Sequence, residues 1–190
     1  MSNTTREKLL LEATHLMCKN GYSAFSYADL SHKIGISKAS IHHHFSTKET
    51  LAKEVIDAAY AQTQQILALI TAQFSQLAAQ LEQYMLLFSD HHQYSRLPLC
   101  CSLSSEYANL PESIQILTQD YFQLQIDWLN QILISAKAQQ QIAATVNTED
   151  MAFMIMKLCE GSSILSRVLN KPELFAQTLQ QILQLFGLPK

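Results

Sequence analysis

The sequence contains few residues that interrupt regular structure, with only 4 Gly and 4 Pro among 190 residues. An all-β protein of this length needs many more turn residues, so this scarcity argues against a sandwich or a barrel and favours helices. The chain also lacks a run of about 18 consecutive apolar residues, so we expect no membrane span. Apolar residues still make up 48% of the chain, which is enough for a core. The composition therefore predicts an all-α protein.

We expect no export signal either, because the N-terminus from Met1 to Arg6 is polar overall and contains no apolar segment of a signal peptide. The sequence contains 4 Cys. We expect reduced thiols and a cytoplasmic protein rather than a disulfide framework.

The net charge of −3 is unevenly distributed. Residues 1–53 carry seven Lys or Arg and four Asp or Glu, whereas residues 54–190 carry six and twelve. A basic head on an acidic body fits a protein that presents one end to a polyanion. Chance variation in surface charge is an equally good explanation of this asymmetry when it is taken alone.

Apolar spacing and capping residues predict about nine helices. The first should cover 5–20, with Gly21 as its stop, and the second 27–34, with Ser26 and Asp29 as a capping box. Gly35 should end the second helix, and Ser37 should cap a third over 38–44. A full capping box from Ser46 to Glu49 is then expected to start the fourth. We expect the later helices from 48 with a break near 71–75, over 100–107, 111–139 and 148–170, and from 172 onward.

Two of these short helices are joined by Gly35-Ile36-Ser37, which has the length and turn of a DNA-binding helix-turn-helix. Ile41 and Phe45 are four residues apart and are expected to anchor the second helix to a core. Its remaining side chains are small or polar, so they can approach base edges and phosphates. The next helix starts with free N–H groups that also favour phosphate. The predicted DNA-binding residues are Ser26, Tyr27, Ser37, Lys38, Ala39, Ser40, His42, His43 and Lys48.

This region resembles the TetR family of repressors over about residues 5–55. The resemblance is carried by Tyr27-Ala28-Asp29-Leu30, Gly35-Ile36-Ser37, Lys38 to His44, Phe45 and Thr47-Lys48-Glu49-Thr50-Leu51. The sequence departs from the family at His42, where the family usually has a Tyr that contacts phosphate. A His can donate there too, in a pH-sensitive way. The resemblance implies an all-helical homodimer, with a DNA-binding domain at 1–50. It also implies an effector-binding and dimerisation domain at 51–190 that controls the spacing of the two DNA heads.

A second, partial resemblance lies in Leu99-Cys100-Cys101-Ser102-Leu103, followed by Glu106 and Leu110-Pro111. It is similar to a segment of one TetR branch that includes acrylate-responsive and electrophile-responsive repressors. In the electrophile-responsive members a cysteine near this point is the sensor, and a Cys in a first helical turn has a lowered pKa. Simple packing is the alternative for each of these Cys, and burial is the commoner fate. Cys18 and Cys159 lie on apolar helix faces and are expected in the core.

The helical faces also predict an effector pocket. Aromatic and Met side chains on the middle helices are expected to line it, and core packing is the alternative. Arg96 or Glu106 would bind a polar end of the effector, and a surface salt bridge is the alternative for each. The predicted effector or sensor residues are Tyr84, Phe88, Arg96, Cys100, Cys101, Glu106, Tyr121, Trp128, Met151 and Met154.

The last two helices carry narrow apolar stripes, which are typical of packing between subunits. In the family they form a four-helix interface, and intrachain packing is the alternative. The predicted dimer residues are Leu158, Ser162, Leu165, Phe175, Leu179, Ile182 and Phe186.

The sequence therefore predicts a repressor that binds a pseudo-palindromic operator as a dimer and is released by a small-molecule effector. An electrophile or oxidant sensor acting through Cys100 or Cys101, and a helical interaction module without DNA binding, are the alternatives. We find no nucleophile–base pair, Gly-rich phosphate loop or metal motif, so we expect no enzymatic activity, cofactor or metal site. Three consecutive His on a helix cannot share an ion, and the spacing of His91, His92, Cys100 and Cys101 matches no standard zinc pattern.

Overall fold

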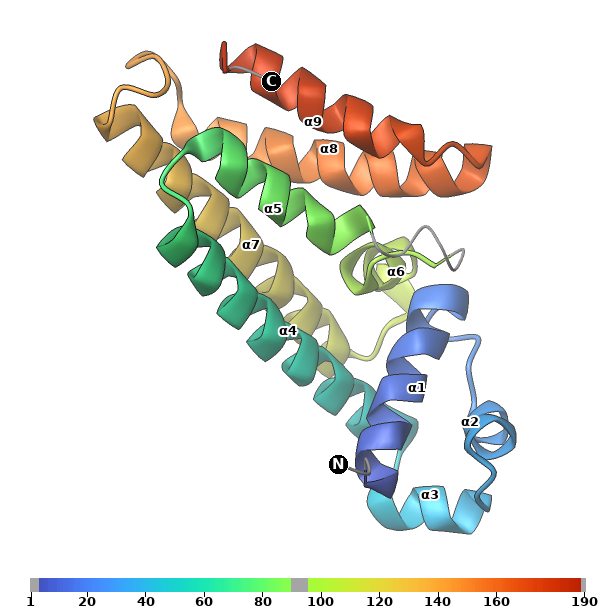
Figure 1. The fold of residues 1–190 in the computed structure, drawn as a ribbon. Helices are drawn as coiled ribbons and strands as arrows, with labels where there is room; N and C mark the ends of the chain where they lie inside the picture. Colours follow the sequence, from blue (N-terminus) through green and yellow to red (C-terminus); the bar gives the residue numbers. More distant parts are fainter. Residues whose placement is uncertain (1–3, 90–95, 189–190) are drawn as a thin grey trace. The chain divides into compact units, whose positions relative to one another are not determined.

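A computed structural model describes residues 4–89 and 96–188, and in these residues it contains nine α-helices, one short 3₁₀ helix and no strand (Figure 1). The prediction of an all-α fold with about nine helices is confirmed. His91 and His92 lie outside the described residues. The helices are α1 (Thr5–Asn20), α2 (Tyr27–Ile34), α3 (Lys38–His44), α4 (Lys48–Gln73), α5 (Leu77–Ser89), α6 (Leu99–Ser105), η2 (Tyr107–Asn109), α7 (Glu112–Ala138), α8 (Thr148–Leu169) and α9 (Glu173–Leu185).

The first three helices begin and end where local capping chemistry predicts. Before α2, the Ser26 Oγ accepts from the Asp29 N–H at 3.4 Å, and the Asp29 carboxylate accepts from the Ser26 N–H at 2.7 Å. Gly35 ends α2 in the left-handed region, with φ 76° and ψ 31°. The Ser37 Oγ then accepts from the Ser40 N–H at 3.1 Å and starts α3.

The predicted capping box at the start of α4 is wrong by one residue. The cap is Thr47, whose Oγ1 accepts from the Thr50 N–H at 3.0 Å, rather than Ser46. Glu49 is therefore not the residue that reaches back to the cap. Its carboxylate instead accepts from the Ser113 hydroxyl and lies 3.6 Å from the Lys53 Nζ. Glu49 therefore contacts Ser113 and Lys53 rather than the backbone N–H of a capping residue.

One compact unit comprises Met1–Ala61 and Leu99–Tyr121. In this unit α1 packs against both α2 and α6 (Figure 1). The contact between α1 and α6 includes a buried hydrogen bond, because the Ser102 hydroxyl donates to the Met17 carbonyl oxygen at 2.6 Å. The apolar side chains at its centre are Leu9, Ala13, Met17, Phe25, Leu30, Ile41, Phe45 and Leu51. The three N-terminal helices thus share one core, and α6 closes part of it.

The second compact unit comprises Gln62–Pro98 and Phe122–Lys190. Its helices α8 and α9 run side by side, and both pack against α5 (Figure 1). Cys159 is buried in α8, as its apolar face predicts, and Cys18 is likewise buried in the other unit. None of the described helices has the length and hydropathy that crossing a membrane requires.

The turn after α1 is tightly constrained. Gly21 has φ 87° and ψ 166°, a region that is essentially restricted to glycine. A Cβ atom on Gly21 would lie 2.6 Å from the Oε1 atom of Glu106, whereas a Cβ on Gly35 would meet no atom within 4 Å. The two glycines therefore differ in what surrounds them, although both have a positive φ.

We predict that Gly21→Ala lowers the free energy of unfolding by about 2–3 kcal/mol, because backbone strain and a clash with Glu106 add together. Gly35→Ala, the control, should lower it by about 1 kcal/mol through backbone strain alone. Urea titrations of both variants, followed by circular dichroism, measure the difference. Equal losses at the two positions would show that the approach of Glu106 contributes nothing.

Candidate DNA-binding and effector sites

Buried residues anchor one side of helix α3, and exposed residues lie on the other. Ile41 and Phe45 are fully buried, as predicted, and hold the helix to its domain. Lys38, Ala39 and the two predicted His lie exposed, and Ser40 is half-buried. The helix therefore presents one small, polar face to solvent, which is the surface that DNA recognition needs. The neighbouring predicted residues Ser26 and Ser37 are exposed, and both hydroxyl oxygens are engaged as helix caps.

Tyr27 supports α3 from behind. Its hydroxyl donates to the Phe45 carbonyl oxygen at 2.9 Å, just beyond the end of α3. Burial, with a smaller contribution from Tyr22, raises the pKa of Tyr27 to about 12, so this hydroxyl keeps its proton. The Tyr27 ring also meets the His42 ring edge-on, with the centroids 4.8 Å apart. On the other side of His42, its Nδ1 lies 3.2 Å from the Ser46 carbonyl oxygen.

The side chain of Lys48 is folded onto the turn between α1 and α2. Its ammonium lies 4.6 Å from the centre of the Tyr22 ring and 4.8 Å from that of Phe25. It also donates to the Ser23 carbonyl oxygen at 3.3 Å. Burial lowers the pKa of Lys48, and attraction to Glu106 and Asp29 opposes that shift. Its predicted role at a DNA phosphate stays a prediction, since this ammonium already has partners inside its own domain.

Glu106, which directly follows α6, binds the same turn between α1 and α2. Its carboxylate accepts from the backbone N–H of Tyr22 and, at 3.0 Å, from that of Ser23. These donors follow the C-terminal end of α1, and Glu106 comes directly after α6. Burial raises the pKa of Tyr22, and the negative charges of Glu49 and then Glu106 raise it further. The sequence placed Glu106 among the effector residues, and the structure places its carboxylate on the turn of the DNA-binding head.

An aromatic cluster occupies the second unit. The Tyr84 ring lies 5.4 Å from that of Phe88 and 5.3 Å from that of Trp128, so three predicted effector residues meet. The Tyr84 hydroxyl donates to the Gln125 Oε1 at 3.3 Å. Sequence reasoning missed Gln125, although its place three residues before Trp128 on one helix face would have indicated it. Phe175, a predicted dimer residue, stacks on Phe88 with the centroids 6.1 Å apart.

The other predicted effector residues are distributed more widely. Tyr121 is buried, whereas Arg96, Met151 and Met154 are half-buried. Cys100 and Cys101 occupy the first turn of α6, as predicted, with exposed fractions of 3% and 0%. Tyr121 and the two Cys belong to the first compact unit, while the aromatic cluster belongs to the second. The predicted effector residues thus lie in two different compact units.

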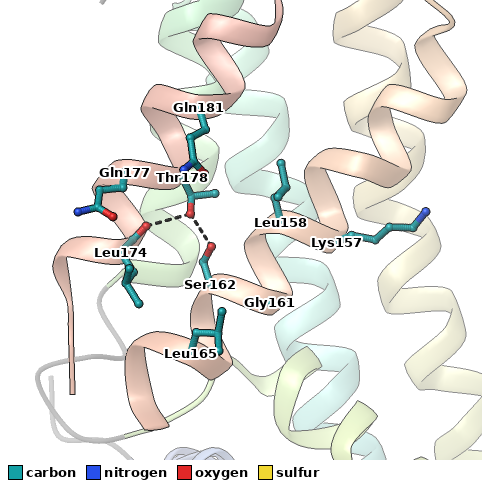
Figure 2. A pocket seen from close by; sticks show the side chains of 9 residues that line it. All are labelled: Lys157, Leu158, Gly161, Ser162, Leu165, Leu174, Gln177, Thr178 and Gln181. Atoms are coloured by element: carbon teal, nitrogen blue, oxygen red, sulfur yellow. Dashed lines mark hydrogen bonds between the residues drawn. The ribbon is translucent and has the colours of Figure 1, made fainter. Parts of the chain in front are cut away.

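A surface hollow of about 300 Å³ lies between α8 and α9 (Figure 2). The predicted dimer residues Leu158, Ser162 and Leu165 line it, beside Gly161, which has no side chain to fill the space. The Thr178 hydroxyl donates to the Leu174 carbonyl oxygen at 2.9 Å and also bonds the Ser162 hydroxyl, which joins α8 to α9. None of the predicted effector residues lines this hollow.

The predicted dimer residues divide by exposure. Ser162, Phe175 and Ile182 are buried within the chain, and Leu158, Leu179 and Phe186 are half-buried. Leu165 is 52% exposed, and its neighbours on the same helix face, Val168 and Leu169, are 73% and 53% exposed. A cluster of exposed apolar side chains therefore ends α8.

The chain was compared with known proteins. The family described as "Bacterial regulatory proteins, tetR family" matches residues 9–55, and "Tetracyclin repressor-like, C-terminal domain" matches residues 74–182. Among curated proteins, none matches the sequence significantly.

Solved structures agree over nearly the whole chain. A TetR transcriptional regulator from Legionella pneumophila is 28% identical, with 98% of each chain covered and a TM-score of 0.87. A TetR family regulator from Agrobacterium tumefaciens is 27% identical, covering 95% of this chain and 96% of its own, with a TM-score of 0.89. The reduced form of E. coli NemR shares the fold at 20% identity, 98% and 99% coverage and a TM-score of 0.84. With its helix-turn-helix, its matching C-terminal domain and these relatives, the chain belongs to the TetR family of bacterial transcriptional regulators.

Proposed function

We propose that this protein is a repressor that binds a pseudo-palindromic DNA operator as a dimer and leaves it when a small effector binds. The observation that carries the proposal is the exposed polar face of α3, which Ile41 and Phe45 anchor from behind. Such a helix enters a major groove, while flanking groups bind the phosphates. The protein then acts on DNA in the cytoplasm and performs no catalysis.

The test is DNA binding by the full chain to duplexes that it selects from a randomised pool. We predict sequence-dependent, salt-sensitive binding, because Lys38 and other groups of the head displace counterions from phosphates. Lys38→Ala should weaken binding and reduce the slope of log K against log salt by about one. Lys171→Ala, an exposed lysine outside the head, is the matched control. If no duplex is enriched, the proposed function is wrong.

We infer that the second copy covers the exposed end of α8. Leu165, Val168 and Leu169 are exposed and recur at the i, i+3 and i+4 spacing of one helix face. A symmetric interface brings the same patch together from both subunits. The hollow beside Gly161 borders this patch and offers room for side chains of the partner.

We predict that Val168→Glu produces a monomer, because a charge on the interface would be buried without a partner. Operator affinity should then fall at least tenfold, since one head binds a half-site alone. Leu69→Glu is the matched control, because Leu69 is 56% exposed on α4. Sedimentation velocity gives the mass of each variant. A Val168→Glu protein that remains dimeric would place the interface elsewhere.

One specific class of effector is a reactive electrophile or oxidant that modifies Cys100 or Cys101. What favours it is the position of α6, where Ser102 donates to the Met17 carbonyl oxygen and Glu106 follows the helix. An adduct on a buried thiol in the first turn would push α6 against these contacts. Packing alone is the alternative for both cysteines, since both are buried.

N-ethylmaleimide serves as the probe of this candidate. We predict that it releases the wild-type protein from its selected duplex, at a rate below that of a free thiol because Cys100 and Cys101 are buried. The double variant Cys100→Ser, Cys101→Ser should stay bound under the same treatment. Cys18→Ser, Cys159→Ser is the control and should still be released. Release of the Cys100→Ser, Cys101→Ser protein would rule the thiols out as the sensor.

A further inference from the structure

The surroundings of His42 determine which of its ring nitrogens carries a proton. Nδ1 lies 3.2 Å from the Ser46 carbonyl oxygen, and a carbonyl oxygen can only accept a hydrogen bond. Nδ1 must therefore hold the hydrogen in that bond. A neutral imidazole has a single N–H, so the other nitrogen, Nε2, then carries a lone pair and can only accept. It becomes a donor only when the ring takes up a second proton.

The protein contacts of His42 bring no negative charge to its ring. The Tyr27 ring of α2 meets the His42 ring in a T-shaped arrangement, with the centroids 4.8 Å apart and an interplanar angle of 64°. The Tyr27 hydroxyl is committed to the Phe45 carbonyl oxygen and stays protonated, so it brings no negative charge. The phosphates of DNA add a strong negative potential at an exposed helix face.

Charged groups on α1, α2, α3 and α4 surround the helix face that carries His42. On α3 itself, Lys38 precedes His42 by four residues and His43 and His44 follow it. On α2, Asp29 is occupied by the N–H and hydroxyl of Ser26, and His32 and Lys33 are exposed.

On α1, Arg6 lies 5.3 Å from the centre of the Phe45 ring and pairs with Glu54. On α4, Lys48 and Glu49 are bound within the domain. The carboxylates of Asp29, Glu49 and Glu54 are thus each engaged by another group of the head, so the negative charge that would pair with a charged His42 ring has to come from the phosphates of DNA.

We propose that His42 takes up a proton when the protein binds DNA, and that its Nε2 then donates to an acceptor on the DNA, either a phosphate oxygen or the N7 atom of guanine. The proposal rests on the proposed function, because it concerns the same recognition helix. A contact with the amino group of adenine or cytosine would use the neutral ring instead, and binding would then involve no proton uptake.

The first experiment measures affinity against pH. The full chain is titrated onto its selected duplex at fixed ionic strength between about pH 5.5 and 8, the range in which histidine changes charge. Affinity should be highest at the acid end and fall by up to about tenfold per pH unit per protomer as pH rises, because the charged ring is the binding form. His42→Gln keeps a neutral side-chain donor and should give a flat profile, while His43→Gln, also exposed, should keep the wild-type slope.

The second experiment counts protons directly. Calorimetry in two buffers of different ionisation enthalpy should show about one proton taken up per wild-type protomer and none by His42→Gln. A purely structural role of His42 would change affinity without changing this count. Uncharged methylphosphonate linkages and 7-deazaguanine, placed singly in the duplex, then identify the acceptor, because the correct substitution removes the pH slope.

The outcomes separate this inference from the proposed function. Sequence-dependent binding without proton uptake, proton release on binding, or a slope that persists in His42→Gln would each overturn the inference and leave the repressor function standing. Failure of the wild-type chain to select any duplex would instead overturn the proposed function itself.

Discussion

The carboxylate of Glu106 on the turn after α1 is the contact that the DNA-binding head depends on. It accepts from the backbone N–H of Tyr22, 84 positions away in the chain, and from that of Ser23. Gly21 makes this approach possible, because a Cβ there would lie 2.6 Å from the carboxylate. From the turn onward the chain enters α2 and then α3. A residue that directly follows α6 therefore holds the turn from which the chain enters the helix-turn-helix.

Elements with local causes could be predicted from the sequence. The bounds of α1, α2 and α3 rest on caps and glycines within a few residues of each helix end, such as the reciprocal pair of Ser26 and Asp29. The start of α4 shows where local reasoning stops. Ser46 and Thr47 are adjacent hydroxyl residues that can both cap a helix, and the structure uses Thr47. Ser113, 64 positions from Glu49, engages the carboxylate that a capping box at Ser46 requires.

The sites were less predictable because their partners carry no sequence signal. Glu106 binds backbone N–H groups, which every residue except proline has, so nothing in the sequence distinguishes Tyr22 and Ser23 as its partners. An apolar stripe likewise does not specify the surface that covers it. Phe175 and Val168 both continue such stripes, yet Phe175 stacks on Phe88 inside the chain while Val168 is 73% exposed. Spacing identifies a face, and only packing shows which part of it remains available to a second copy.

The construction of α3 explains why its outer face can change without loss of the fold. A helix of seven residues is too short to be stable alone, so α3 persists through Ile41, Phe45 and the hydrogen bond from Tyr27. None of these groups belongs to the exposed face. Substitutions on the exposed face therefore leave these anchoring contacts in place and change the chemistry that the helix presents to solvent.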